Sequence, residues 1–191
     1  MTPEEYWKEA QRGSESAWKE LYSLFGSRLN SFFLKNTGDI EISMDKTQEV
    51  FEKLFRKKEM FSDGSLKCWV FRIAKNLLID WWRSKQRHYS ETANIETVEI
   101  AGNEPPVDYQ VIEKLDREEL LRYVDETLEL LEFEDRIAIG LVYLGGLTVS
   151  EYSQLMDLPL GTAKTRVRHA RLQLDSRISS KCAMREVRNE K

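Results

Sequence analysis

The side chains best suited to contacting another macromolecule lie in residues 161–174. If this segment is helical, at about 100° per residue, its small apolar side chains form one narrow stripe and its polar side chains face the other way. The stripe consists of Ala163, Val167, Ala170 and Leu174. The opposite face presents Thr165, Arg168 and His169, with Lys164 and Arg171 on one flank. Hydrogen-bonding and cationic groups of this kind contact the phosphates and base edges of DNA.

A second, shorter amphipathic segment precedes this one, at residues 148–157. Its inner side would carry Val149, Tyr152, Leu155 and Met156, and Pro159 breaks the chain between the two segments. The pair predicts a helix-turn-helix, whose second helix enters the major groove. The alternative for residues 161–174 alone is a basic terminal helix that faces only solvent.

Residues 66–87 are the second segment that could contact nucleic acid. Its apolar side chains, from Trp69 to Trp82, cover a broad arc of the predicted helix. The remaining face carries Arg72, Lys75, Asn76, Arg83 and Arg87, together with Asp80. Exposed cations beside aromatic rings can neutralise phosphates and hold an unpaired base. Most of the aromatic residues, including Trp81 and Trp82 taken singly, fit an ordinary hydrophobic core better than a base-binding surface.

The rest of the chain reads as helical, so the predicted fold class is all-α. The pattern indicates helices over residues 14–36, 43–58, 112–131 and 133–144. In the helix over 43–58 we expect the inner positions to be Val50, Phe51, Leu54 and Phe55. Its outer positions would then include Asp45, Gln48, Glu49 and Glu52. A solvated charged surface is the alternative for this outer face.

Composition favours two small domains. The chain has 191 residues, of which 41% are hydrophobic, enough for two cores of modest size. Its net charge of -4 is unevenly distributed: residues 91–135 carry 15 acidic and 3 basic side chains, whereas both ends are mildly basic. Residues 88–111 have low hydrophobicity and contain Gly102 and a Pro105-Pro106 pair. We therefore expect a flexible linker there.

The sequence gives no indication of a cofactor or of a membrane segment. Cys68 and Cys182 lie far apart in the chain, outside any metal-ligand spacing, and only two histidines occur. The N-terminus is acidic and polar, and every apolar run is too short to span a bilayer. We expect a soluble protein of a reducing cytoplasm, monomeric when free, with no cofactor, no metal and no small-molecule substrate.

The two halves together resemble the sigma factors of the sigma-70 family, in the extracytoplasmic function group that has only regions 2 and 4. Residues 45–55, DKTQEVFEKLF, resemble the region 2 helix that docks on RNA polymerase. Residues 69–83, WVFRIAKNLLIDWWR, resemble the helix after the -10 recognition loop, and residues 133–171 resemble region 4. The resemblance implies region 2 at residues 1–88, a linker at 89–111, region 4 at 112–178 and a basic tail at 179–191.

The same resemblance implies the partners and the contact residues. The partners would be promoter DNA and core RNA polymerase, through the clamp helices of its largest subunit and its flap. The core-binding residues would be Asp45, Gln48, Glu49 and Glu52. The -10 element would be contacted by Phe61, Arg72, Ile73, Lys75, Asn76 and Arg83. The -35 element would be read by Thr162, Lys164, Thr165, Arg166, Arg168, His169 and Arg171.

The resemblance also implies control by an anti-sigma factor, which would cover surfaces that polymerase and DNA need. Two departures from the family pattern concern the DNA-reading half. Arg168-His169 stands where many members have an aromatic residue or His followed by Arg, which exchanges the character of two DNA-facing side chains. Tyr152-Ser153 is bulkier and more polar than the usual Ile-Ala, and we expect the packing to adapt.

Two other classes of protein compete with this interpretation. A helix-turn-helix repressor or activator would use only the C-terminal half for DNA and would bind duplex DNA without polymerase. An enzyme would need a metal cluster, a phosphate-binding glycine loop or a nucleophile motif, and the sequence shows none of these patterns.

Overall fold

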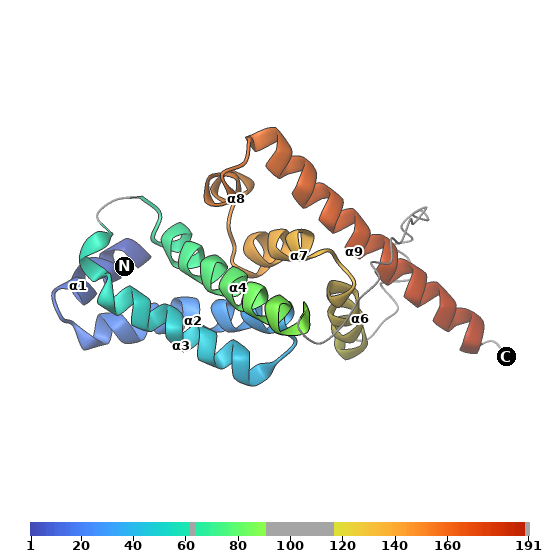
Figure 1. Ribbon diagram of the computed structural model, residues 1–191, viewed down its shortest axis with the longest axis horizontal. Coiled ribbons are helices and arrows are strands. Elements are labelled where there is room, and N and C mark those ends of the chain that lie inside the picture. Colours follow the sequence, from blue (N-terminus) through green and yellow to red (C-terminus); the bar gives the residue numbers. More distant parts are fainter. Residues whose placement is uncertain (62–63, 91–116, 190–191) are drawn as a thin grey trace.

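The computed structural model is built from helices (Figure 1). It describes residues 1–61, 64–90 and 117–189. For residues 88–90, 117–121 and 181–189 it describes the backbone only. Within those ranges every regular element is helical, as predicted. Most of the predicted linker, residues 91–111, lies outside the described residues. No helix of the described part is long and apolar enough to cross a bilayer.

The N-terminal half contains α1 (Pro3–Gln11), α2 (Glu15–Thr37), α3 (Ile40–Arg56), a 3-10 turn (Lys58–Met60) and α4 (Leu66–Ser90). Local signals set its helix ends. Thr2 and Glu5 form a reciprocal capping box at the start of α1. Gly38 ends α2 at φ 70°, a left-handed conformation that glycine adopts readily. Asp39 then caps α3 through the backbone N–H of Ile42.

The inner face of α3 differs from the expected one. Ser43, Thr47, Val50 and Leu54 are its buried residues. Phe51 is half-buried, and Phe55 is 57% exposed, so the expectation that Phe55 points inward was wrong. The reason is that the small polar residues bury their hydroxyls by bonding them to the helix backbone, Thr47 to the Ser43 carbonyl at 2.8 Å. With these residues on the inner face, Phe55 lies at the edge of α3 beside Trp18, with ring centroids 5.6 Å apart.

The C-terminal half contains α6 (Arg117–Glu129), α7 (Phe133–Ile139), a π-helical turn (Gly140–Leu144), α8 (Val149–Met156) and α9 (Leu160–Asn189). The helix α9 is much longer than the predicted recognition helix and runs through most of the segment expected to be a tail, 179–191. The apolar stripe simply continues: Ile178, one turn beyond Leu174, is buried. The basic end of the chain therefore extends the recognition helix.

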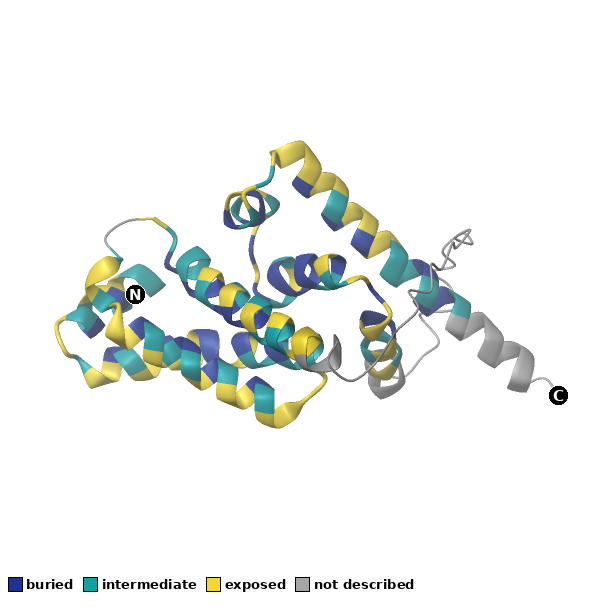
Figure 2. Cartoon of the chain, viewed as in Figure 1, coloured by how far each residue is buried: buried dark blue, intermediate teal, exposed yellow. Residues whose placement is uncertain are grey.

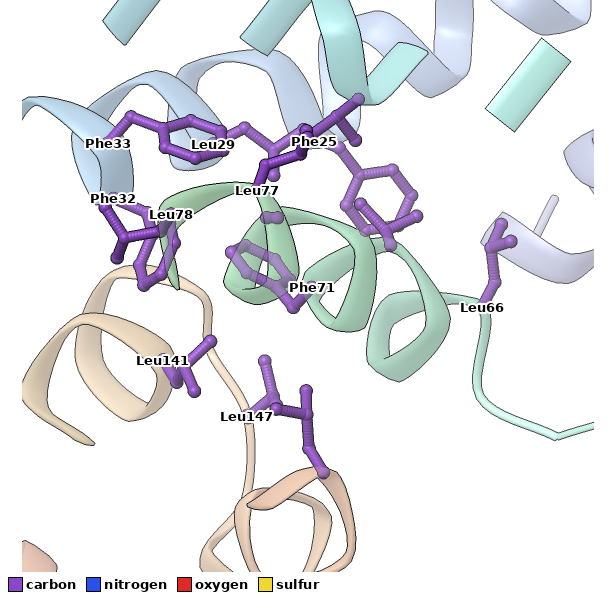
Figure 3. Packing of buried hydrophobic residues seen from close by; sticks show 14 of the residues in the cluster. Phe25, Leu29, Phe32, Phe33, Leu66, Phe71, Leu77, Leu78, Leu141 and Leu147 are labelled. Carbon is purple, nitrogen blue, oxygen red and sulfur yellow. The ribbon is translucent and has the colours of Figure 1, made fainter. Parts of the chain in front are cut away.

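The two halves share one hydrophobic core. Phe71 of α4 and Phe32 of α2 lie opposite Leu141 and Leu147 of the C-terminal half (Figure 3), and all four are fully or almost fully buried. A smaller second cluster joins α6, the loop after it and α7 to α9 around Leu128, Leu131, Ile139 and Ala170. Only the second cluster belongs to the C-terminal half alone, so the placement of α7 and α8 depends on the N-terminal helices.

Glycines allow the two halves to approach this closely. A β-carbon on Gly140 would lie 2.9 Å from a ring carbon of Phe32. One on Gly145 would lie 3.0 Å from the Phe71 ring and 2.6 Å from the carbonyl oxygen of Leu141. Contacts under 3 Å to buried rings and backbone leave no room for a larger residue. The π-helical turn can thus pack closely against α2 and α4 because Gly140 at its start and Gly145 after its end have no β-carbon.

Polar and aromatic contacts also join the two halves. Glu151, in the first turn of α8, accepts a hydrogen bond from the Ser65 hydroxyl at 3.1 Å and forms an ion pair with Lys67 at 3.0 Å. Lys67 also donates to the carbonyl of Gly146 at 2.8 Å. Trp82 stacks on Phe133 with ring planes 10° apart and centroids 4.8 Å apart. These contacts bring the start and the last third of α4 against the C-terminal half.

Glu151 has two structural roles, because it also completes a capping box with Thr148. Burial alone raises the pKa of Glu151. The hydrogen bonds from the Thr148 backbone and from Lys67 outweigh that effect and lower the pKa to about 2. The ionised carboxylate therefore stabilises both α8 and its contact with α4.

We predict that Glu151→Gln lowers the free energy of unfolding at pH 7 by about 1–2 kcal/mol, allowing for solvent screening of a partly exposed carboxylate. The folded pKa of about 2 lies below the ordinary value of 4.5. The charge of Glu151 therefore makes its full contribution to the free energy of unfolding above about pH 4.5, and this contribution is lost as the pH falls toward 2. Urea unfolding of both proteins at pH 7, 4.5 and 3.5 should show the difference shrinking in acid.

Glu5→Gln is the matched control for this prediction. Glu5 accepts from the Thr2 backbone at 2.7 Å in the α1 capping box, as Glu151 does from Thr148 at the same distance. Gln can still accept the capping bond at N3, so both variants keep a cap and lose the charge, whereas the ion pair with Lys67 is lost only in Glu151→Gln. Equal destabilisation by the two variants would show that the ion pair between Glu151 and Lys67 contributes nothing to stability.

Candidate nucleic-acid interface

The helix-turn-helix forms from α8 and α9, as the sequence predicted. Tyr152 and Leu155 of α8 are buried, and Val149 and Met156 are half-buried beside them. The turn begins at Asp157, the one non-glycine residue of the described chain with a positive φ, 53°. The Ser153 hydroxyl donates to the Leu158 carbonyl at 2.7 Å and so closes the turn. The polar residue that departs from the family pattern is accommodated by this bond, and its neighbour Tyr152 is fully buried.

The outer face of α9 is solvent-exposed from the start of the helix (Figure 2). The inner stripe is as predicted, with Ala163, Val167 and Ala170 buried and Leu174 half-buried. Six of the seven predicted -35 residues are exposed, namely Thr162, Lys164, Thr165, Arg168, His169 and Arg171. A continuous polar surface with several cations therefore runs along one side of α9.

Arg166 lies apart from the other six. It is half-buried, and its guanidinium forms an ion pair with Glu134 of α7 at 2.9 Å. The guanidinium is thus turned toward α7 rather than along the exposed face. Sequence reasoning missed this acidic partner, because Glu134 is separated from Arg166 by a helix, a turn and another helix.

A second acidic residue of α7 also contacts α9. Asp135 is almost fully buried, and its Oδ2 lies 3.3 Å from Nδ1 of His169. Gln173, one turn further along α9, places its Nε2 atom 3.3 Å from Nε2 of the same imidazole. These groups border a hollow lined by Asp135, Gly161, Thr162, Thr165, Arg166 and His169. Asp135 and Gln173 were not among the predicted site residues.

The outer strip of α4 brings together most of the predicted -10 residues. Arg72, Asn76 and Arg83 are exposed and lie along one line of the helix. Ile73 is half-buried beside them. Phe61 packs on Trp69, one turn before Ile73, with ring centroids 5.2 Å apart. Aromatic rings and cations thus lie side by side near the start of α4.

Lys75 lies on another side of α4. Its ammonium donates to the Leu155 carbonyl of α8 at 3.3 Å. Burial lowers the pKa of Lys75, and the neighbouring charge of Arg72 lowers it further. The structure therefore separates this residue from the line formed by Arg72, Asn76 and Arg83.

The outer face of α3 carries the predicted polymerase-binding residues. Asp45, Gln48 and Glu52 are exposed, and Gln48 donates to Glu52 at 3.1 Å. Glu49 is half-buried and pairs with Lys46 at 2.8 Å and with Lys53 at 3.3 Å. Burial raises the pKa of Glu49, but its bonds to these two lysines lower it overall. Its charge is thus largely balanced within α3.

An exposed apolar stripe runs next to these acidic residues, and sequence reasoning missed it. Ile40, Met44 and Phe55 of α3 are between 57% and 65% exposed, and Tyr22 of α2 is 58% exposed. Tyr22 packs on Phe51 with ring centroids 4.8 Å apart, which joins the two helices into one surface. The spacing 40, 44, 51, 55 is a helical stripe of its own, distinct from the buried one, and would have revealed this surface.

A metal or catalytic centre does not emerge from the described residues. Over residues 1–61, 64–90 and 117–189, no three His, Cys, Asp or Glu side chains are grouped as metal ligands would be. Cys68 is a free thiol in this part of the chain, and burial raises its pKa. The arrangement is suited to binding through charge, aromatic rings and hydrogen bonds.

Two family descriptions match the chain. Residues 21–88 match Sigma-70 region 2, and residues 121–174 match Sigma-70, region 4. The first covers α4 and the outer face of α3, and the second covers α8 and the exposed start of α9. Each of the candidate surfaces described above therefore lies in a matched segment.

The chain is also similar to characterised proteins over most of its length. It is 25% identical to the ECF RNA polymerase sigma factor SigW of Bacillus subtilis over 173 residues, which cover 86% of this chain and 90% of that protein. It is 27% identical to the ECF RNA polymerase sigma-E factor of Escherichia coli K12 over 175 residues, covering 88% and 90%.

Two solved structures resemble the fold. One is the sigma factor RpoE of Bartonella quintana in complex with the anti-sigma factor NepR, with a TM-score of 0.63 and 25% identity, covering 84% of this chain and 96% of that one. The other is CnrH in complex with the cytosolic domain of CnrY, with a TM-score of 0.55 and 19% identity, covering 88% and 92%. The second likeness concerns the fold alone.

Proposed function

The chain belongs to the sigma-70 family of RNA polymerase sigma factors, in the extracytoplasmic function group, and we propose that it directs core RNA polymerase to a specific class of promoters. Sigma factors are initiation factors, so the chain is not an enzyme. The observation that carries the proposal is the presence of two separate exposed basic surfaces, on α4 and on α9, in one chain. A simple repressor of the helix-turn-helix class would need only the second.

The recognition helix α9 is proposed to read the -35 element. Its exposed start is the part of a recognition helix that reaches base edges in the major groove. Thr162, Lys164, Thr165, Arg168, His169 and Arg171 supply donors and acceptors on that side. Arg166 is assigned the supporting role that its ion pair with Glu134 suggests, with its remaining N–H groups directed to the DNA backbone.

The outer strip of α4 is proposed to bind the -10 element. Arg72 and Arg83 are placed to neutralise phosphates, and Asn76 offers an amide to a base edge. Phe61 and Ile73 would border the site of an unstacked base, since aromatic and apolar faces hold bases without sequence restriction. Lys75 joins this set only when its bond to the Leu155 carbonyl is released.

The outer face of α3 is proposed to bind the clamp helices of the largest polymerase subunit, while the C-terminal half binds the flap. The surface combines an apolar stripe with acidic neighbours, Asp45 and Glu52. A partner helix with apolar residues flanked by basic ones would match both features. Glu49, already paired with two lysines, would contribute less than the exposed acids.

Control by an anti-sigma factor is the regulatory part of the proposal, with the protein acting in the cytoplasm as a monomer when free. A structure similar to this one was solved with an anti-sigma factor bound, which supports the same mode here. A partner that covers Asp45, Glu49 or Arg72 would block polymerase or DNA without unfolding the chain. Occlusion requires no ligand-binding site in the chain itself.

In a run-off reaction with core polymerase and a genomic promoter library, we expect the chain to direct transcription from a subset of promoters. Glu52→Lys should weaken binding to core polymerase on the order of tenfold, because it places a cation against a basic partner. Glu20→Lys, an equal charge change at an exposed position of α2, is the control and should bind normally. Duplex binding without any dependence on polymerase would favour the repressor class instead.

Arg168→Ala should cost about 1–3 kcal/mol of promoter binding and relax the preference at one -35 position, if the guanidinium contacts a base edge. Selection of promoters from a library randomised over the -35 element measures that preference. A uniform loss across all sequences would identify Arg168 as a phosphate contact.

Affinity isolation of the tagged chain from cells that lack the inducing signal should recover an inhibitory protein that competes with core polymerase. Mass spectrometry identifies the bound proteins, and purified polymerase tests the competition. Recovery of polymerase subunits only, with activity following the abundance of the chain, would show that control lies in synthesis or degradation.

A further inference from the structure

A short chain of hydrogen-bonding groups connects α7 to the exposed face of α9. It runs from Asp135 through the imidazole of His169 to the amide of Gln173. The Asp135 side chain is only 12% exposed, whereas that of His169 is 59% exposed. One end of the imidazole is thus anchored in the protein, and the ring itself reaches the surface that the proposed function assigns to DNA.

The chemistry of the two partners selects one form of the neutral ring. An ionised carboxylate can only accept hydrogen bonds, so the Asp135 contact requires a proton on Nδ1 of His169. The amide nitrogen of Gln173 can only donate, and it lies 3.3 Å from Nε2, which can accept once the proton is on Nδ1. The same nitrogen also lies 3.2 Å from Nδ1, but a protonated Nδ1 cannot accept its hydrogen. Asp135 therefore selects a ring with hydrogen on Nδ1 and an acceptor at Nε2, and the position of the Gln173 amide is compatible with that form.

We propose that Asp135 is a positioning residue that makes His169 a hydrogen-bond acceptor toward the -35 element. The inference rests on the proposed function, in which α9 enters the major groove. In that groove only adenine N6 and cytosine N4 present amino donors, whereas guanine and thymine present acceptors. Held by Asp135, His169 therefore selects adenine or cytosine, and the base amino group takes the place of the Gln173 amide at Nε2.

This selection differs from that of an arginine, which many family members carry at the position of His169. A guanidinium has donors only and pairs with the two acceptors of guanine. A neutral imidazole fixed by Asp135 instead offers a hydrogen-bond acceptor to the same base position. The acidic start of α7 thus sets the base preference of α9 from a helix that does not itself need to contact DNA.

The position of Asp135 suits it to this role. It lies in the first turn of α7, next to Glu134, which pairs with Arg166 of α9. Two consecutive acidic residues therefore hold two side chains of the recognition helix, three residues apart. Burial of the Asp135 carboxylate restricts its rotamers and so fixes the orientation of the ring that it holds.

The ring form is measured by nitrogen-15 NMR of the full-length chain over a series of pH values, from the spectra that show a neutral ring. The chain has only two histidines, so comparison with His169→Gln assigns the signals. We expect the His169 spectrum of a ring protonated on Nδ1. In Asp135→Asn, whose amide can either donate or accept, the protonation on Nε2 should increase. A wild-type ring protonated on Nε2 overturns the proposal, even if the variant does not fold.

The base preference is measured with holoenzyme, the full chain bound to core polymerase, on promoters randomised over the -35 element. His169→Ala identifies the base position that the ring reads. At that position alone, Asp135→Asn should reduce the preference for adenine or cytosine about 3- to 10-fold, the effect of one hydrogen bond. Glu132→Gln removes an equal charge at the start of α7, from an exposed side chain, and should leave the preference unchanged.

The outcomes separate this inference from the proposed function. If the wild-type holoenzyme selects a -35 sequence but neither His169→Ala nor Asp135→Asn alters any single position, the role of Asp135 is wrong and the proposed function remains. A preference for guanine or thymine at the His169 position also overturns it. If the wild-type holoenzyme selects no -35 sequence at all, the proposed function itself fails.

Discussion

The close packing of the Gly140–Leu144 turn against the rings of Phe32 and Phe71 constrains the rest of the structure. The buried rings leave space for hydrogen atoms only at Gly140 and Gly145. The turn therefore seats Leu141 in the N-terminal core and directs the chain into α8 (Figure 3). Because α9 packs on α8 and α7, the orientation of the recognition helix depends on a contact made with helices of the other half. The two matched regions are thus joined by packing as well as by the chain.

Much of this architecture could be predicted from the sequence, because its signals are local. The helix-turn-helix follows from two amphipathic stripes and the intervening Pro159, and the caps at Thr2 and Thr148 follow from residues three positions apart. The exposed cations of α4 are predicted by helical periodicity, because the apolar residues occupy a broad arc and leave the cations on the remaining face. Each of these features is determined by residues within one or two helical turns of one another.

The remaining features depend on residues far apart in the chain. Arg166 and Arg168 are the same residue type on the same helix, yet Glu134 turns Arg166 away from the exposed face. Lys75 belongs to the basic strip by residue type, but the carbonyl of Leu155 holds it on another side. The orientation of these side chains depends on tertiary contacts, so the helical periodicity of the sequence does not predict it.

The contact between Lys75 of α4 and Leu155 of α8 keeps these two helices closer together than the promoter elements that their halves would bind. If α4 and α9 bind the -10 and -35 elements, those sites lie on the order of 25 base pairs, or roughly 85 Å of duplex, apart at ~3.4 Å per base pair. In this structure α4 touches the helix that precedes α9. Binding both elements of a straight duplex therefore requires the halves to separate and expose Phe71 and Leu141. The free energy of that exposure must be offset by polymerase and DNA together, which links promoter occupancy to the presence of the enzyme.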